Sequence, residues 1–189
     1  MAQHRAVQHR AVLEAAERLI VNGHGKVPTV GEIATEVGLA RPSIYRYISS
    51  QHDLLVQLLI LATETWNEKL EDWIKAVPED PAPRICAYVD ATLDLFLHGS
   101  HGALMVATQS FPTTFADERV QKSHAGFVSV MKKFCPGLSP VDISLLNAAI
   151  LKAAEQPIKT PDLARATETL YKMAIAIVAD AAPDSTPSK

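Results

Sequence analysis

The spacing of apolar residues along this chain is helical almost throughout. Apolar side chains recur every three or four residues, which places them on one face of an α-helix. No stretch shows the sustained alternation of apolar and polar residues that is typical of a half-buried strand. We therefore predict an all-α fold of about nine helices.

Cap and turn residues divide the first part of this pattern into three helices. The first is expected to end near Gly23, and Thr29 with Glu32 forms a capping-box pattern that opens the second. Gly38 is expected to end the second helix, and a third, short helix is predicted over residues 41–48.

Prolines and further caps divide the remainder. Helices are expected over about residues 50–76, 84–97, 102–109, 113–134, 140–155 and 161–182. Ser139-Pro140 and Thr160-Pro161 each place an N-cap residue before a proline, whose missing N–H costs nothing in the first turn. The last residues, 183–189, are polar and are predicted to be a disordered tail.

Residues 29–55 carry the most informative spacing. Ala34 is small enough to lie where two helices cross, and four residues later Gly38 allows a tight turn with positive φ. The apolar residues that would hold the two helices together are Ile33, Val37, Leu39, Ile44 and Ile48. This spacing predicts a helix-turn-helix, whose second helix enters the major groove of DNA.

The outward positions of this motif suit a nucleic acid. Arginines bind phosphate, or guanine in a bidentate manner, and hydroxyls bond phosphate or base edges. The N-terminus of a helix also favours an anion. The candidate DNA-binding residues are Lys26, Thr29, Arg41, Pro42, Ser43, Tyr45, Arg46 and Tyr47. The alternative is a helix-turn-helix that serves packing alone, with these side chains merely solvated.

The segment resembles the TetR family of bacterial regulators. The resemblance covers about residues 7–58 and rests on VLEAAERLIVNG, TVGEIATEVGL, SIYRYI and DLL. It implies a DNA-binding domain over residues 1–50 and a helical effector-binding and dimerisation domain over residues 51–182. In that family a ligand usually lowers affinity for the operator. The resemblance places Thr29, Arg41, Pro42, Ser43, Tyr45 and Tyr47 where family members touch DNA.

Three positions depart from the family pattern. Ala40 stands where a capping Ser is usual, and Pro42 stands near a position that is usually a small residue, often Gly. Gln51 stands where a Lys commonly begins the fourth helix and binds phosphate. One cation fewer predicts weaker DNA binding that depends less on salt.

Aromatic residues and methionines in the middle of the chain are candidates for an effector pocket. Trp66 and Trp73 are seven residues apart on one apolar stripe, which equally suits a packed core. The family resemblance favours a pocket, and its candidate lining residues are Trp66, Trp73, Phe96, Met105, Phe111, Phe115, Phe127 and Met131.

The last two helices carry the signal for a homodimer. Residues 141–154 are apolar almost all round, which indicates a helix buried on more than one side. A four-helix bundle with a second copy would satisfy this, as in the family; the alternative is that both helices cap the core of one chain. The candidate interface residues are Leu145, Ala149, Lys152, Leu163, Leu170, Ala174 and Ile177.

Composition and charge narrow the function further. The net charge is −3, with about +1 on residues 1–55, so the front of the chain is mildly basic. Two cysteines make no disulfide framework, and no apolar run spans a membrane, so we expect a cytoplasmic protein. Neither a catalytic constellation nor a firm metal spacing appears, so no cofactor and no enzyme activity are expected.

The sequence thus predicts a repressor released from a near-palindromic, double-stranded operator by an unknown small-molecule effector. The alternative is a small-molecule-binding or interaction protein with a degenerate helix-turn-helix, which Ala40 and Gln51 favour.

Overall fold

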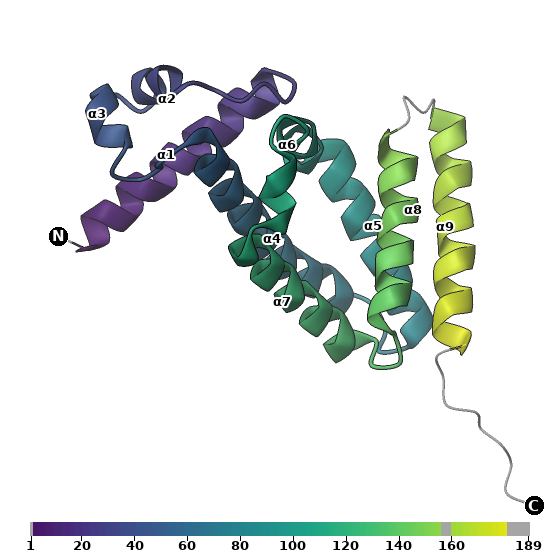
Figure 1. Ribbon diagram of the computed structural model, residues 1–189. Helices are drawn as coiled ribbons and strands as arrows, with labels where there is room; N and C mark the ends of the chain where they lie inside the picture. Colours follow the sequence, from purple (N-terminus) through teal and green to yellow (C-terminus); the bar gives the residue numbers. More distant parts are fainter. Residues whose placement is uncertain (1, 156–159, 181–189) are drawn as a thin grey trace, which may run out of the picture. The chain divides into compact units, whose positions relative to one another are not determined.

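The computed structural model describes residues 2–155 and 160–180, and all of their side chains except those of residues 2, 124, 126–130, 155, 160 and 161. Within these residues the chain is helical and contains no strand, which confirms the all-α prediction (Figure 1). The helices are α1 Ala2–Asn22, α2 Val30–Glu36, α3 Arg41–Ile44, α4 Gln51–Lys75, α5 Pro81–His98, α6 His101–Thr108, the 3₁₀ helix η1 Pro112–Ala116, α7 Glu118–Phe134, α8 Pro140–Glu155 and α9 Thr160–Asp180. The predicted tail, 183–189, lies outside the described residues.

Most helix boundaries follow the predicted caps. Ser139 Oγ accepts the backbone N–H of Asp142 at 3.2 Å, and the Asp142 carboxylate accepts the Ser139 N–H at 3.0 Å, which begins α8. Three boundaries differ from the prediction. The helix expected over 113–134 is divided into the 3₁₀ helix η1 and helix α7, which begins at Glu118. Helix α3 ends at Ile44 and continues to residue 47 as turns. Helix α5 begins at Pro81 because prolines are tolerated in a first turn, where the N–H has no intrahelical partner.

The described chain divides into two compact units. The first comprises residues up to Glu64 together with Ser100–Ser123, and the second comprises Thr65–Gly99 together with residues from His124 on. Helices α4 and α7 therefore each run from one unit into the other. The first unit is larger than the predicted 1–50 domain because the start of α4 and helix α6 share its core. The assignment of functions to domains remains a prediction.

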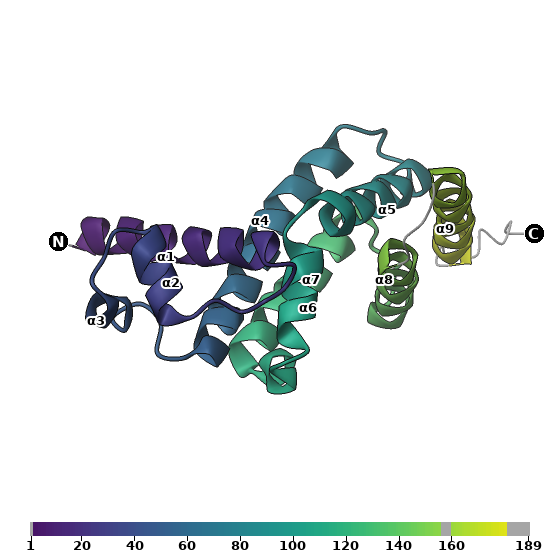
Figure 2. The same cartoon turned by 90° about the horizontal axis from the view of Figure 1, so that it is seen from above.

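The first unit is organised around one apolar cluster. Helices α1 to α3, the beginning of α4 and helix α6 all contribute to it (Figure 2). Its fully buried members include Val12, Ile20, Ile33, Ile44, Leu54, Leu55 and Leu104. Gly25, at φ 90°, lets the turn after α1 approach α6 closely, because a Cβ there would lie 2.5 Å from Val106. This core holds the predicted helix-turn-helix in place.

The second unit is built on α5, α8 and α9, with the end of α4 and of α7. Helices α8 and α9 lie side by side and antiparallel, and both contact α5 (Figures 1 and 2). Tyr88 of α5 is fully buried, and its hydroxyl donates to Asn147 of α8. The ring of Trp66 meets Tyr88 edge-on at 6.1 Å between centroids. Across the described residues, no helix is both long and apolar enough to span a bilayer.

Candidate nucleic-acid interface

Helix α2 begins with the capping box that the sequence predicts. Thr29 Oγ1 accepts the Glu32 backbone N–H at 3.2 Å, and Glu32 accepts the Thr29 N–H at 2.7 Å. These bonds from Thr29 hold the pKa of Glu32 below its usual range. The Thr29 hydroxyl also donates to Glu32 at 2.7 Å. A carboxylate therefore already lies at the end of α2 where a phosphate was expected.

The turn between α2 and α3 has the predicted geometry. Gly38 has φ 66°, a left-handed conformation that costs a residue with a Cβ more than it costs glycine. The Leu39 backbone N–H donates to the Ala34 carbonyl at 2.9 Å, and Ala34 is 4% exposed at the crossing. The small side chain and the glycine thus fill the two roles assigned to them.

Helix α3 presents a polar face over two apolar anchors. Ile44 and Ile48 are buried in the first core, which fixes the orientation of the helix and the turn that follows. The candidate residues Arg41, Pro42, Tyr45 and Arg46 are exposed, and Ser43 is half-buried. Tyr45 is 51% exposed, an unusual position for a large aromatic ring. These side chains are free to meet a duplex.

Tyr47 lies differently from the other candidates. It is half-buried, its ring stacks on His9 of α1 at 5.9 Å, and its hydroxyl donates to Gln8 at 3.2 Å. Its phenol therefore joins the turns after α3 to α1 instead of projecting outward. Sequence spacing alone does not reveal this difference, because Tyr45 and Tyr47 are only two residues apart and spacing does not show where α1 lies.

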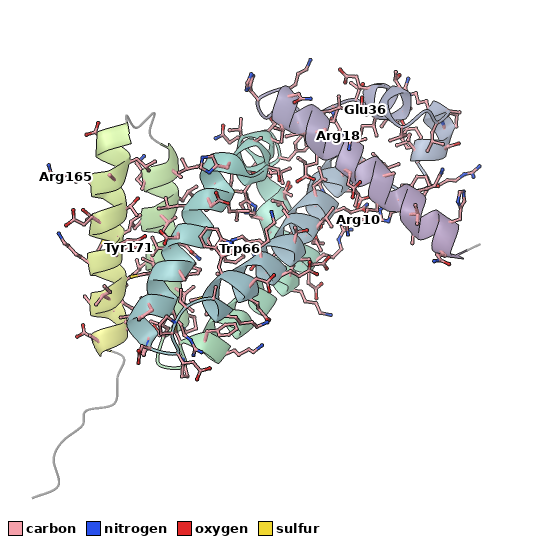
Figure 3. The ribbon with its side chains drawn as sticks, turned by 180° about the vertical axis from the view of Figure 1, so that it is seen from behind. Arg10, Arg18, Glu36, Trp66, Arg165 and Tyr171 are labelled. Atoms are coloured by element: carbon pink, nitrogen blue, oxygen red, sulfur yellow. The ribbon has the colours of Figure 1, made fainter. Side chains whose placement is uncertain are left out.

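Two further positions frame the motif. Lys26 is exposed before α2, where its charge favours the ionised form of Glu32. Gln51, which replaces the usual Lys, donates from Nε2 to the Pro28 carbonyl at 3.3 Å. It thus ties the start of α4 to the segment that precedes α2. Figure 3 shows a second tie, in which Arg18 of α1 lies next to Glu36 of α2, with 3.4 Å between Nη2 and Oε1.

An open groove borders the end of the α3 segment. The lining residues are His4, Arg5, Ala6, Gln8 and His9 of α1 with Arg46, Tyr47 and Gln57. Arg5 Nη2 donates to the Arg46 carbonyl at 3.5 Å, so two cations lie at this edge. The DNA-binding candidates predicted from the sequence do not include Gln57, whose only sequence signal is the four-residue spacing from Asp53.

Comparison with known proteins supplies the fold but no sequence relative. No family model matches the chain, and no curated protein matches it. FadR from Bacillus subtilis, solved in complex with stearoyl-CoA, has a TM-score of 0.62 at 17% identity, covering 88% of this chain and 97% of that one. FadR from Bacillus halodurans has a TM-score of 0.64 at 14% identity, covering 88% and 94%. A TetR-family regulator from Marinobacter aquaeolei VT8 has 0.59 at 18%, covering 92% and 98%.

This chain has the fold of TetR-like regulators. The likeness spans both units, since most of the length of each chain is matched. Identity below a fifth means that the shared property is the backbone arrangement and not the individual site residues. The side chains of this TetR-like fold must therefore be judged by their own surroundings.

The candidate pocket residues fall in both units of the TetR-like fold. Met105, Phe111 and Phe115 are half-buried against the first core. In the second unit, Trp66 and Met131 are buried and Phe96 packs against the same core. The side chain of Phe127 lies outside the described residues. These positions do not decide between a packed core and a pocket, so the pocket stays a prediction.

Trp73 departs from the predicted stripe. Trp66 is 8% exposed, whereas Trp73 is 42% exposed, so the buried stripe of α4 continues through Leu70 and Ile74. Trp73 instead lines a surface groove with Asp72, Ala76, Val77, Pro83, Cys86, Ala87 and Asp90. Burial and the Asp90 carboxylate raise the pKa of the Cys86 thiol, which therefore stays protonated.

The candidate dimer residues separate into buried and exposed groups. Leu170 and Ala174 are 4% and 0% exposed and belong to the core of their own chain, which corrects their assignment to a dimer surface. Ala149, Leu163 and Ile177 are half-buried. The face of α9 that carries Leu170 and Ala174 is buried because α9 packs on both α5 and α8; Tyr171, labelled in Figure 3, donates to Asp90 of α5.

Helix α8 has an exposed stripe opposite its buried face. Val141 and Leu145 are 65% and 64% exposed, and Ala148 and Lys152 are exposed as well. The spacing of four, three and four residues places all of them on one side of the helix. Leu145 and Lys152 were predicted interface residues, whereas Val141 was missed although the spacing includes it.

Proposed function

We propose that this protein is a homodimeric transcriptional regulator that binds operator DNA through α2 and α3. The observation that carries the proposal is the exposed polar face of α3, with Arg41, Tyr45 and Arg46 outward above Ile44 and Ile48 in the core. Such a face matches phosphates and base edges in a major groove. The TetR-like fold supports the proposal, since the solved proteins that share it are described as transcriptional regulators.

The dimer in this proposal forms through α8 and α9. Val141, Leu145 and Ala148 offer an apolar strip, and Met173 of α9 is 43% exposed. Exposed apolar stripes of this kind mark protein interfaces. A two-fold dimer requires a near-palindromic operator with half-sites about 34 Å apart or a multiple of that.

The effector in this proposal is a small molecule with an apolar chain or ring, which releases the repressor from DNA. The B. subtilis FadR structure contains stearoyl-CoA, and the candidate pocket residues here are aromatic or methionine. Stearoyl-CoA is therefore the first probe to add to a DNA-binding assay, and decanoate is a shorter comparison. By this proposal, the protein acts in the cytoplasm.

A second candidate function is a small-molecule-binding or interaction protein whose DNA-binding surface has degenerated. Three observations favour it. Ala40 supplies no side-chain cap to α3, Gln51 bonds Pro28 where a cation is usual, and Glu32 places a negative charge at the start of α2. The missing cap makes the start of α3 less stable, and the lost cation and the added carboxylate each weaken a phosphate contact.

Selection of duplexes from a random DNA library separates the two candidates. We expect the wild-type chain to recover a palindromic sequence and to bind it with an affinity that falls steeply with salt. Tyr45→Ala is expected to weaken this binding by about tenfold, since a base or phosphate contact is worth about 1–3 kcal/mol. Val106→Ala, which also trims an exposed apolar side chain of the first unit, is the matched control. Recovery of no preferred sequence would favour the degenerate motif.

A further inference from the structure

Asp53, in the first turn of α4, collects donors from three parts of the first unit. Its Oδ2 accepts the Ser49 backbone N–H at 2.9 Å and Gln57 Nε2 at 3.0 Å. Its Oδ1 accepts Arg119 Nη1, from the start of α7, at 2.9 Å. The Asp53 side chain is only 16% exposed, so water competes little for these bonds.

Gln57 extends the contacts by one helical turn. Its Nε2 donates to the Tyr47 carbonyl at 3.0 Å, and its Oε1 lies 2.6 Å from His9 Nε2. Side chains of α4 thus hold the Tyr47 carbonyl and the Ser49 N–H, which flank the buried Ile48. The backbone that leaves α3 is therefore held on both sides of its apolar anchor.

Arg119 is itself held in place before it reaches Asp53. Asp117 accepts Arg119 Nη2 at 3.0 Å, Nε at 3.1 Å and the Arg119 backbone N–H at 2.9 Å. This fork-to-carboxylate pairing fixes the plane of the guanidinium. Both carboxylates also favour its charged form and raise the pKa of Arg119. Its Nη1 is thereby aimed at Asp53.

We propose that Arg119 is a positioning residue for DNA binding, acting through Asp53 and Gln57 on the segment that follows α3. The inference rests on the proposed function and deepens it. Arg119 lies 66 residues from Asp53 in sequence and comes from a different helix, yet a hydrogen bond joins the two side chains directly. Arg119 lies in the first turn of α7, which begins at Glu118.

The test compares Arg119→Gln with Lys75→Gln, which removes one cation from the exposed Lys75–Glu71 pair of the second unit. The probe is the duplex recovered by the wild-type chain. Arg119→Gln is expected to weaken binding about fivefold or more, within the range of known couplings between sites. The slope of affinity against salt should stay unchanged, because no phosphate contact is lost. Lys75→Gln should change neither quantity.

Two further measurements separate positioning from a direct contact. Amide hydrogen exchange at Ser49 should become faster in Arg119→Gln without DNA present, since Asp53 is no longer fixed. The double variant with Gln57→Leu should lose less affinity than the two single losses multiplied together, because both act on one segment. Asp117→Asn, which keeps the cation, should produce a smaller loss in the same direction and serves if Arg119→Gln folds poorly.

The outcomes are distinct. A salt slope that falls by about one would make Arg119 a phosphate contact and overturn the inference. Unchanged affinity or unchanged Ser49 exchange would overturn it as well. If the wild-type chain binds no duplex, the proposed function fails and the inference falls with it; if it binds DNA regardless of Arg119, the inference alone fails.

Discussion

Helices α3 and α8 both bury isoleucines on one face, but their exposed faces differ in polarity. Each helix buries isoleucines, Ile44 in one and Ile143 with Ile150 in the other. Above this anchor α3 carries arginines and a tyrosine, whereas α8 carries Val141 and Leu145. An isolated chain leaves both faces in water.

The difference between these faces indicates different partners. Charged and hydroxyl-bearing side chains lose little by remaining hydrated until a phosphate replaces the water. Exposed branched aliphatic side chains gain by leaving water, at about 25 cal/mol per Å² of buried apolar area. We therefore propose DNA as the partner of the α3 face and a second copy of the chain as the partner of the α8 face.

The largest expected effect is on stability, and it compares a buried leucine of α9 with an exposed leucine of α8. Leu170→Ala should lower the free energy of unfolding by about 2–5 kcal/mol, because it leaves a cavity where α9 packs. Leu145→Ala, at an exposed position of α8, should lower it by less than about 1 kcal/mol in the monomer. Urea unfolding, at a protein concentration below the dissociation constant of the dimer, measures both free energies. Equal losses of stability in the two variants would contradict the burial of Leu170.

The next effect sharpens the comparison on the exposed side. Leu145→Glu should weaken dimerisation by about 2–4 kcal/mol, because it places a charge in an apolar contact. Sedimentation equilibrium should then give the monomer mass while circular dichroism stays unchanged. Ala164→Glu, which adds the same charge at an exposed position of α9, is the control. A dimer that survives Leu145→Glu would exclude this face of α8.

The smallest expected effect is a pH dependence of stability, and it comes from Asp53, which holds the segment after α3. Burial by itself raises the pKa of Asp53, but the N–H of Ser49 and the donors of Arg119 and Gln57 outweigh it, so the pKa lies below its usual range. Because the folded pKa is below the unfolded one, the stabilisation is complete above the unfolded pKa and is lost as pH falls through the folded pKa. The stability difference between wild type and Asp53→Asn should shrink below about pH 4. Urea titrations from pH 3 to pH 7 measure it, and a constant difference would contradict the account.

The local part of the fold could be predicted from the sequence. The capping box at Thr29, the glycine at Gly38 and the N-cap at Ser139 act on neighbours a few residues away, so spacing suffices to find them. The length of α3 did not follow, because the apolar spacing continues to Ile48 while the backbone tightens after Ile44, where Arg46 N–H donates to Ser43 and Tyr47 N–H to Ile44, each three residues back.

What could not be predicted depends on neighbours far away in sequence. Tyr47 and Tyr45 have the same chemistry, and only the position of α1 turns one ring onto His9. Leu170 and Leu145 are both apolar residues of the last two helices, and only the packing of α9 on α5 and α8 buries the first.

The sequence by itself determined that this chain is helical, where most helices begin and end, and that it contains a helix-turn-helix, since each depends on contacts within a few residues. Tertiary structure alone decided which side chains stay exposed and that Arg119 meets Asp53. Those contacts depend on the directions in which separate helices pack, and helical periodicity specifies a face without specifying what that face meets.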